Sequence, residues 1–382
     1  MSEKFIFMDY NSTTPVDKEV VESMLPYFNI KFGNPSSKHH FGNEAHVAVE
    51  YARKQISSLV NCNPDEIIFT SGATESNNLV IKGVVEHLFK EGVNIVTSEI
   101  EHTSVLDTVK SLKKSGVEVR YVKPDEYGLI DPKDIETSID ENTVLVSIMT
   151  ANNEIGTIQP IPEIGQICRN RNVIFHTDAV QAFGKMPIDV KDYNIDLMSI
   201  SAHKIYGPKG VGALYVSNSS ANKISAQING GGHEKGLRSG TLNVSGIVGF
   251  GKAAEIASQR MYSDFTKEIV MRDILMQNLL NKIPYSILNG SREKRLPNNV
   301  NISFEGVDSS VLISSLKNIA LSTGSACSSA TLERSYVLNS IGKPDSLIKS
   351  AVRFGIGRQT TEEEIMYVVE KVIESVNKLR LK

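Results

Sequence analysis

The chain has 382 residues, enough for one large domain plus a smaller one and enough to bury a sizeable core. Hydrophobic residues make up 40% and charged residues 22%, and 41 basic against 44 acidic side chains give a formal charge of −3. This balance excludes a general nucleic-acid binder and a polybasic membrane face, so neither partner is expected. The sequence contains no run of about 18 apolar residues, so no transmembrane helix is predicted.

The chain contains three cysteines, Cys62, Cys168 and Cys327. They are too few for a disulfide framework, and no CxxC pair indicates a zinc site, so no metal site is expected. The first ten residues do not match a signal peptide. Together these features predict a cytoplasmic protein whose thiols stay reduced.

Short apolar runs alternate with helical spacing through the first 220 residues, which is typical of an α/β fold with a mostly parallel sheet. The helical patterns cover residues 75–90, 103–115 and 161–172. The predicted strands cover residues 66–70, 94–98, 117–122, 143–150, 173–179, 196–200 and 210–216.

The pattern changes after about residue 255 and predicts a smaller α+β domain. We place the large domain at residues 15–255 and the small domain at residues 1–14 and 256–382. Within the small domain the expected elements are a helix over 254–283, a strand over 299–304, and helices over 310–318 and 361–379.

The segment SISAHKIYGPKG, residues 199–210, brings Ser201, His203 and Lys204 from a strand into a Gly/Pro turn. Burying an ammonium group is costly, so a lysine at the end of a buried strand is uncommon. Such a lysine can lower its pKa and form a Schiff base with a carbonyl compound. The alternative is a lysine that simply reaches solvent from the strand end.

The strand VIFHTDAVQ, residues 173–181, ends in His176, Asp178 and Gln181. Ligands of open α/β sheets bind outside the carboxyl ends of the strands. An acid in this position can pair with a protonated pyridine nitrogen of a cofactor. Asp178 could equally cap the element that follows.

The segment TSGATESN, residues 70–77, follows a strand and opens a helix with Ala73 and Thr74 at its start. Free backbone N–H groups at a helix N-terminus can cradle a phosphate, although an ordinary capped turn has the same pattern. His102 and Asn153 also follow strands. His102 is either a residue for acid–base chemistry or a structural histidine. Asn153 either binds a carboxylate or closes a turn.

Two further loops are rich in small residues. GGGHEKGLRSGTLN, residues 230–243, contains Thr241 and is either a long surface loop or a segment that another group approaches closely. LSTGSACSSAT, residues 321–331, places Cys327 among small residues, which suits an accessible, mobile nucleophile. Cys62 and Cys168 sit in patterns that indicate structural roles. A loose G-x-G-x-x-A over residues 249–254 is rejected as a dinucleotide site, because no strand precedes it and its surroundings read as helix.

Taken together, these segments resemble the cysteine desulfurases of the NifS/IscS kind, from about residue 7 to about residue 375. The quoted loops carry part of the resemblance. The rest lies in DYNSTTPV (9–16), FGNPSS (32–37), EHTSVLD (101–107), NNEIG (152–156), HTDAVQAFGK (176–185), SAHKIYGPKGVGALYV (201–216), STGSACSSATLERSYVL (322–338) and VRFGIGR (352–358). The resemblance implies a type I pyridoxal-phosphate-dependent transferase fold and a homodimer.

The resemblance also implies a role for each matching residue. Lys204 would bind pyridoxal 5′-phosphate covalently, His102 would stack on its ring and shuttle protons, and Cys327 would receive sulfur. Arg353 and Asn153 would bind the carboxylate of the substrate, L-cysteine. The remaining cofactor contacts would be Asp178 to the pyridine nitrogen, Gln181 to the phenolic oxygen, Ala73, Thr74, Ser201 and His203 around the phosphate, and Thr241 to the phosphate of the neighbouring subunit.

The implied product is alanine, with a persulfide on Cys327 that passes to an iron–sulfur scaffold protein or another sulfur acceptor. Cys327 would contact a cluster at most transiently. A selenocysteine lyase, another lyase or an aminotransferase on the same fold would need Lys204 but not Cys327. A non-catalytic sulfur-transfer scaffold would need neither Lys204 nor the cofactor.

The sequence departs from the family pattern in two places. Arg334 stands where the family often has proline, which changes the stiffness of the loop but not the chemistry. The sequence ends at Lys382, whereas members that serve general iron–sulfur assembly usually carry a longer tail that helps to dock the scaffold. That mode of docking is therefore not expected here.

Overall fold

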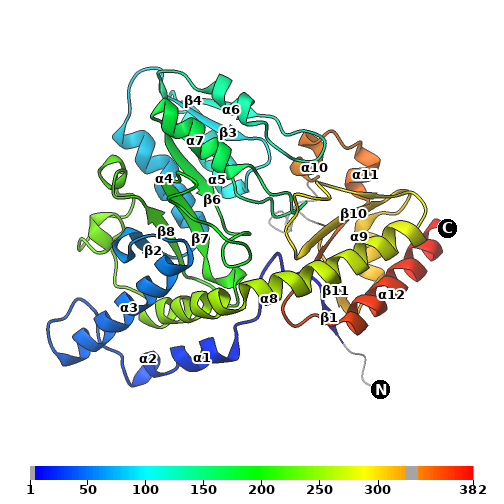
Figure 1. Ribbon diagram of the computed structural model, residues 1–382, viewed down its shortest axis with the longest axis horizontal. Coiled ribbons are helices and arrows are strands. Elements are labelled where there is room, and N and C mark those ends of the chain that lie inside the picture. The colour runs from blue at the N-terminus through cyan, green and yellow to red at the C-terminus, as the bar shows by residue number, and fades with distance from the viewer. Residues whose placement is uncertain (1–4, 324–333, 382) are drawn as a thin grey trace.

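The computed structural model describes residues 5–323 and 334–381, and its centre is a seven-stranded sheet (Figure 1). Neighbouring strands run parallel except at β8, which is antiparallel to both of its neighbours. The mostly parallel α/β sheet predicted from the sequence is confirmed. In spatial order the strands are β2 (Ile67–Thr70), β8 (Gly212–Val216), β7 (Leu197–Ser201), β6 (Ile174–Asp178), β5 (Thr143–Ser147), β3 (Asn94–Ser98) and β4 (Glu118–Val122).

Each strand predicted for this sheet is present, with its ends shifted by a few residues. Every residue of β3, β5, β6, β7 and β8 is buried. Strands that are covered on both faces read as continuous apolar runs, which is why the sequence pattern located them.

Helices cover both faces of the sheet. α4 and α5 pack against the strands in one hydrophobic cluster, and α3, α7 and the first half of α8 form another. The sequence patterns predicted α4, α5 and α7 but did not indicate α1, α2, α3 or α6. The bounds are α1 (Lys18–Met24), α2 (Pro26–Asn29), α3 (His40–Leu59), α4 (Ala73–His87), α5 (Thr103–Lys113), α6 (Pro132–Ser138) and α7 (Ile161–Arg171), with 3₁₀ turns η1 (Pro64–Glu66), η2 (Ala202–Lys204), η3 (Ala221–Lys223) and η4 (Glu234–Gly236).

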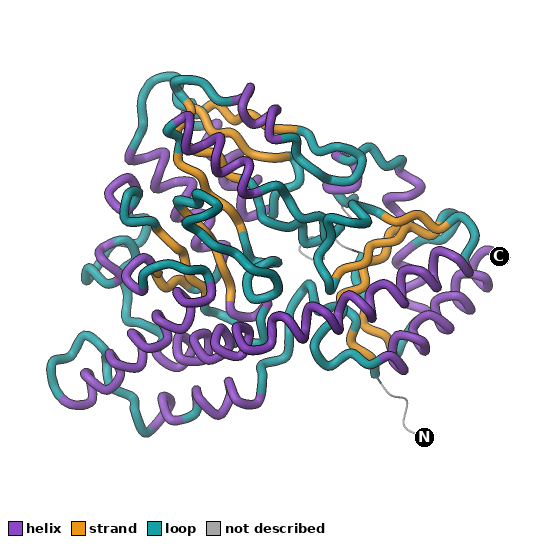
Figure 2. Tube along the Cα trace, in the orientation of Figure 1, coloured by secondary structure: helices purple, strands orange, loops and turns teal. Residues whose placement is uncertain are grey.

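The long helix α8 (Val244–Lys282) leads from the large sheet to a smaller group of strands (Figures 1 and 2). The glycines of the rejected dinucleotide pattern lie inside it. A Cβ added to Gly251 would lie 2.6 Å from the Cα atom of Ala52 in α3, and one added to Gly249 would lie 2.6 Å from Met24 Sδ. These glycines therefore allow close packing of α8 against α3 and against the segment of α1.

The C-terminal part has an antiparallel three-stranded sheet in the order β12-β10-β9, with α12 packed beside α8. The N-terminal strand β1 pairs in parallel with β11 in this same part. The bounds are β1 (Ile6–Phe7), β9 (Ser286–Leu288), β10 (Asn299–Phe304), α9 (Ser309–Ser315), β11 (Ile319–Ala320), α10 (Tyr336–Ser340), α11 (Asp345–Lys349), β12 (Ala351–Gly355) and α12 (Glu362–Arg380).

A separate hydrophobic cluster joins the second half of α8 with β1, β10, β12 and α12. The division of the chain at residue 255 stays a prediction, because α8 passes through that point without a break. Within residues 5–323 and 334–381, no helix is long and apolar enough to cross a membrane. The same residues contain no group of three or more His, Cys, Asp or Glu side chains that could hold a metal ion.

Candidate active site

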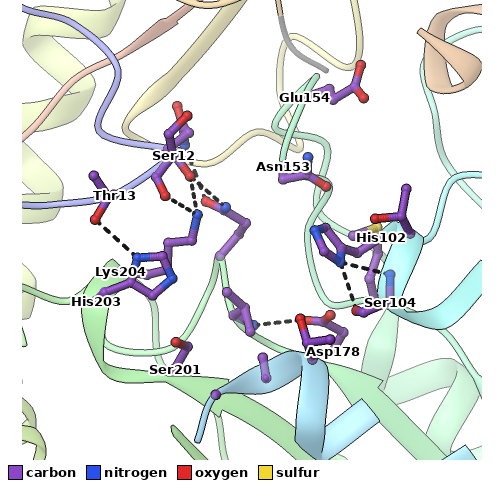
Figure 3. Close-up of a pocket in the computed structure, with 18 of the residues that line it drawn as sticks. Ser12, Thr13, His102, Ser104, Asn153, Glu154, Asp178, Ser201, His203 and Lys204 are labelled. Carbon is purple, nitrogen blue, oxygen red and sulfur yellow. Dashed lines mark hydrogen bonds between the residues drawn. The ribbon is translucent and has the colours of Figure 1, made fainter. Parts of the chain in front are cut away.

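A cavity of about 630 Å³ lies where the carboxyl ends of β6 and β7 face the N-terminus of α4 (Figure 3). Its position follows the rule that ligands of α/β sheets bind outside the carboxyl ends of the strands. It brings together most of the residues that the sequence singled out, while their roles remain predictions. Those in its lining are Ala73, Thr74, His102, Asn153, Asp178, Gln181, Ser201, His203, Lys204 and Arg353.

Lys204 ends the 3₁₀ turn η2, which follows β7 directly. Its Nζ donates to the backbone oxygens of Asn11, at 2.6 Å, and Ser12, at 2.7 Å. The amine therefore lies inside the cavity, next to the N-terminal segment, and does not extend to bulk solvent. This position excludes the alternative of a lysine that merely reaches solvent from a strand end.

Asp178 is the last residue of β6, the strand next to β7. Its Oδ2 accepts from Asn77 Nδ2 at 2.8 Å, and its Oδ1 accepts from the backbone N–H of Val180 at 3.1 Å. Asp178 thus caps a turn and also faces the cavity, so the two sequence interpretations hold together. Gln181 follows in the same turn and donates from Nε2 to the backbone oxygen of Asn11 at 3.0 Å.

His102 is the N-cap of α5, and its ring lies in the cavity (Figure 3). Its Nδ1 accepts from the backbone N–H of Ser104 at 3.1 Å and lies 2.8 Å from Ser104 Oγ. Asn77 Nδ2 donates both to Ser104 Oγ, at 2.8 Å, and to Asp178. Asn77 and Ser104 thereby join the histidine to the aspartate. Sequence reasoning missed both residues, although each lies in a quoted segment.

The start of α4 and the residues around His203 form the end of the cavity suited to an anion. The N-cap of α4 is Gly72, which has no side chain to bond the first N–H groups of the helix. His203 Nδ1 lies 3.1 Å from Thr13 Oγ1. Burial first, and then the charges of Lys204 and Lys209, lower the pKa of His203 to about 4. His203 is therefore neutral at pH 7 and surrounded by cations, a setting that favours phosphate.

Arg353 lies on β12 and is 2% exposed. Its Nη1 donates to the backbone oxygen of Asn153 at 2.9 Å, and its Nη2 donates to Asp9 Oδ1 at 2.8 Å and Ser12 Oγ at 2.7 Å. The guanidinium group is thus held in one orientation at the cavity wall. The side-chain oxygen of Asn153 is buried and has no hydrogen-bond partner among the described residues.

Two predicted residues lie outside this group. Thr241 is exposed in the segment before α8 and does not line the cavity. Cys327 lies outside the described residues. On its two sides, Ser322 pairs with Arg353 through backbone hydrogen bonds, and Arg334 and Tyr336 line the cavity. Both described flanks of the cysteine segment are therefore next to the site.

The other two thiols have environments that suppress their reactivity. Burial raises the pKa of Cys62 to about 12 and raises that of Cys168 further. Because the thiolate is the nucleophile, neither side chain is reactive at neutral pH. Their predicted structural role agrees with these surroundings.

The residues in the cavity fit pyridoxal phosphate as a cofactor. Lys204 offers an amine that can react with an aldehyde, and Asp178 offers a carboxylate for a pyridine nitrogen. The first turn of α4 and the cations around His203 offer a setting for the phosphate group. The planar ring of His102 lies across the cavity from Lys204 and His203 and offers a surface for stacking (Figure 3).

Glu101 is a fully buried carboxyl next to His102 that the sequence analysis did not assign. Its Oε1 accepts from Ser98 Oγ at 2.6 Å and from the backbone N–H of Met149 at 3.0 Å. Its Oε2 has no hydrogen-bond partner within the described part of the chain. Burial, opposed by these hydrogen bonds and supported by the charge of Asp178, raises the pKa of Glu101 to about 8. The group is therefore mostly protonated at pH 7 in the folded protein.

The change Glu101→Gln should make the folded protein less sensitive to alkaline pH. Glu101 has a raised pKa in the folded state, so its stabilising effect is complete below pH 4.5 and is lost as the pH rises toward 8. The variant has no such loss, and its free energy of unfolding should gain about 2–4 kcal/mol relative to wild type between pH 5 and pH 8. Urea unfolding of both proteins at several pH values measures this difference. Parallel profiles would show that Glu101 is not protonated in the folded state.

Comparisons with known proteins give consistent results. Residues 6–368 match the model of the family described as aminotransferase class-V. The chain is 53% identical over 383 residues to a mitosomal cysteine desulfurase of Encephalitozoon cuniculi, which covers 99% of this chain and 88% of that protein. It is 50% identical over 376 residues to the cysteine desulfurase IscS of Rickettsia typhi, and this alignment covers 98% of this chain and 92% of that protein. A solved NifS-like protein superposes with a TM-score of 0.92 at 38% identity, covering 98% of this chain and 100% of that one.

Proposed function

This chain belongs to the aminotransferase class-V family, and on that premise we propose that it is a pyridoxal-phosphate-dependent cysteine desulfurase. It converts L-cysteine to L-alanine and leaves the sulfur as a persulfide on Cys327. The observation that carries the proposal is the meeting of Lys204, Asp178 and His102 in one cavity that is flanked by both described ends of the cysteine segment.

The site residues divide the binding of the cofactor among them. Lys204 would bind it covalently and Asp178 would face the pyridine nitrogen, with His102 against the ring. When bound, pyridoxal phosphate withdraws electrons from the Cα–H bond of an amino acid, so that this weak acid ionises near neutral pH. The phosphate group would be held by Ala73, Thr74, Ser201 and His203, and the phenolic oxygen by Gln181.

Arg353 and Asn153 would bind the carboxylate of the substrate. The guanidinium group is held by Asp9 and Ser12, so little side-chain freedom is lost when a planar carboxylate binds. The amine of Lys204 would take the proton from Cα of the substrate and return it during turnover. His102 would move protons at the cofactor, with its orientation fixed by Ser104.

Cys327 carries out the sulfur transfer. Its thiolate attacks the substrate sulfur, so a sulfur–sulfur bond forms and the Cβ–S bond of the substrate breaks. The electron pair of the broken bond goes to Cβ, which takes up a proton and becomes the methyl group of alanine. Cys327 lies five positions after Ser322, and an extended chain spans about 3.5 Å per residue. A segment of this length would allow Cys327 to reach a substrate in the cavity, because Ser322 pairs with Arg353 of the cavity wall.

The homodimer is supported by a group of exposed apolar side chains in α2, in α3 and in the residues that flank α2. Figure 1 shows these two helices next to α1. Apolar patches of this kind are typical of protein interfaces, and a second copy would cover this one. Thr241 would then reach the phosphate of the neighbouring subunit. The patch consists of Leu25, Phe28, Ile30, Phe32, Phe41, Val47 and Tyr51. The persulfide would pass to an iron–sulfur scaffold protein or another sulfur acceptor in the cytoplasm.

A paired assay of the wild type and Cys327→Ala tests this function. The purified proteins are compared for cofactor absorbance, and alanine and sulfide are then measured after addition of L-cysteine and a reductant. We expect both products from the wild type and the loss of cysteine turnover in the variant, because alanine formation requires a sulfur acceptor at residue 327. The cofactor absorbance should be the same in both proteins.

Two other outcomes would overturn the proposal. Normal turnover by Cys327→Ala would identify a lyase or an aminotransferase on the same fold, including a selenocysteine lyase. A wild-type protein that binds no cofactor would favour a non-catalytic sulfur-transfer scaffold. Each outcome is distinguished by the same two measurements.

A further inference from the structure

A second, much smaller cavity shares Lys204 with the large one. Its volume is about 20 Å³, and it lies where the large sheet, α8 and the C-terminal part of the chain meet. Lys204 and Tyr206 reach it from the segment after β7, and Glu268 reaches it from α8. Its further polar lining includes Tyr10, Lys185, Asn298 and Arg358.

Two buried polar atoms at this cavity have no hydrogen-bond partner among the described residues: Lys185 Nζ and Asn298 Oδ1. The first is a donor and the second an acceptor, and Asn298 is 1% exposed. Glu268 is 6% exposed and adds a carboxyl group to the same small space. Buried polar atoms in proteins are nearly always satisfied, by protein or by an ordered water.

The cavity has the size that one water molecule needs. A volume of this order, measured for water-sized probes, holds a single water, which typically makes two to four hydrogen bonds. Lys185, Glu268 and Asn298 supply a donor, a carboxyl group and an amide oxygen for those bonds. Since Lys185 Nζ has no hydrogen-bond partner among the described residues, no direct hydrogen bond joins it to Glu268, and a water between the two side chains would supply one to each.

The charges of the two side chains act on each other inside the protein. Burial lowers the pKa of Lys185 and raises the pKa of Glu268, and the attraction between them opposes both shifts. The groups around the pair are Arg353 and His203 near Lys185, and Asp264, Arg358 and Lys267 near Glu268, with Tyr10, Tyr206 and Lys204 in the cavity wall.

The turn that carries Lys185 is closely fitted to the Lys204 segment. Gly184 has a φ of +70°, and a Cβ added there would lie 2.9 Å from Ile205 Cγ2 and 3.1 Å from Ala257 Cβ. Ile205 is the residue that follows Lys204. Any larger residue than glycine would push the two segments apart, so the position of Lys185 behind the cofactor-binding lysine is fixed by packing.

We propose that Lys185, Glu268 and Asn298 bind one water molecule and form a charged positioning cluster for Lys204. The effect on Lys204 rests on the proposed function, because it requires that Lys204 binds the cofactor. When ionised, Glu268 favours the protonated form of the nitrogen of Lys204, and protonated Lys185 opposes that form, because charges interact strongly where water is excluded. Neither residue touches the substrate, so both act through Lys204.

The test uses the isosteric variants Lys185→Met and Glu268→Gln as holoenzymes. The absorbance of the linkage between Lys204 and the cofactor is recorded against pH, and the midpoint of its transition is compared with that of the wild type. The midpoint should rise in Lys185→Met and fall in Glu268→Gln, each by about 0.5–1 pH unit. Shifts of the same sign, or no shift in either variant, would overturn the proposal, because a purely structural role predicts no opposite response.

A high-resolution crystal structure of the wild type gives a second readout that does not depend on the cofactor or on the folding of a variant. One ordered water should lie within hydrogen-bond distance of Lys185 Nζ and Asn298 Oδ1. A dry cavity, or a direct bond between these side chains, would refute the cluster. If the wild type bound no cofactor, the proposed function would fail while this water remained a separate observation.

Discussion

Replacing Lys204 by alanine should lower cysteine turnover by about 10³-fold or more and abolish the absorbance of the enzyme-linked cofactor. Lys204 Nζ lies inside the cavity, bonded to the backbone oxygens of Asn11 and Ser12. The substitution removes both the covalent link and the amine that moves the Cα proton, so the two losses should occur together. Steady-state alanine production and an absorbance spectrum measure them.

Lys191→Ala is a matched control, because Lys191 is an exposed lysine in a loop and is not part of the cavity lining. It should keep the wild-type spectrum and rate. Reduction of the wild type with borohydride, followed by peptide mapping, should place the cofactor on the peptide that contains Lys204. Label on another lysine, or wild-type turnover by Lys204→Ala, would contradict the assignment.

The strands of the large sheet could be predicted because burial on both faces leaves a local signature, as in the fully buried β5. The strand β1 leaves none, since it has two residues and pairs with β11 more than 300 positions away. The helix α3 was also missed. It buries small residues such as Ala52, whose close packing against α8 depends on Gly251, far along the chain.

The strand-end positions of Lys204 and Asp178 were visible in the sequence because parallel strands bring their carboxyl ends to one edge of a sheet. The bonds that orient them were not. Asn11 reaches Gln181 and Lys204 from the N-terminal segment, and Asn77 joins Asp178 to Ser104. Such contacts depend on the tertiary fold and leave no periodicity. His176, which the sequence grouped with Asp178 and Gln181 at a strand end, lies in the middle of β6 and is a core side chain bonded to Ser147 and Ser199.

The glycine-rich segment 230–243 shows the same limit. Its composition predicted a surface loop or a closely approached segment, but Glu234 within it is 8% exposed and bonds to α3 and β2. A single buried carboxylate thus ties a loop of small residues to the core. The composition of a segment indicates only its average environment, so a single buried carboxylate within it cannot be predicted from composition.

Replacing Glu234 by alanine should lower the free energy of unfolding by about 3 kcal/mol, the lower end of the usual cost of removing one partner of a buried ion pair, because Glu50 Oε1 still lies 3.2 Å from Arg53 Nε. Glu234 Oε1 accepts from Arg53 Nη2 at 2.8 Å, and Oε2 accepts from Arg53 Nη1 at 3.0 Å and from the backbone N–H of Phe69 at 2.6 Å. The side chain of Arg53 is only 9% exposed, so solvent cannot replace the lost carboxylate. Urea unfolding at pH 7 measures the change.

Lys235→Ala provides the matched control from the next position in the chain. Lys235 Nζ lies 3.2 Å from Asp65 Oδ2, but about half of each side chain is exposed, so its loss should cost less than about 1 kcal/mol. If both substitutions changed the free energy of unfolding equally, the buried ion pair would contribute no more to stability than the exposed one. Phe69 lies four positions before Ala73, the first residue of α4, so Glu234→Ala should also weaken cofactor binding, whereas Lys235→Ala should not.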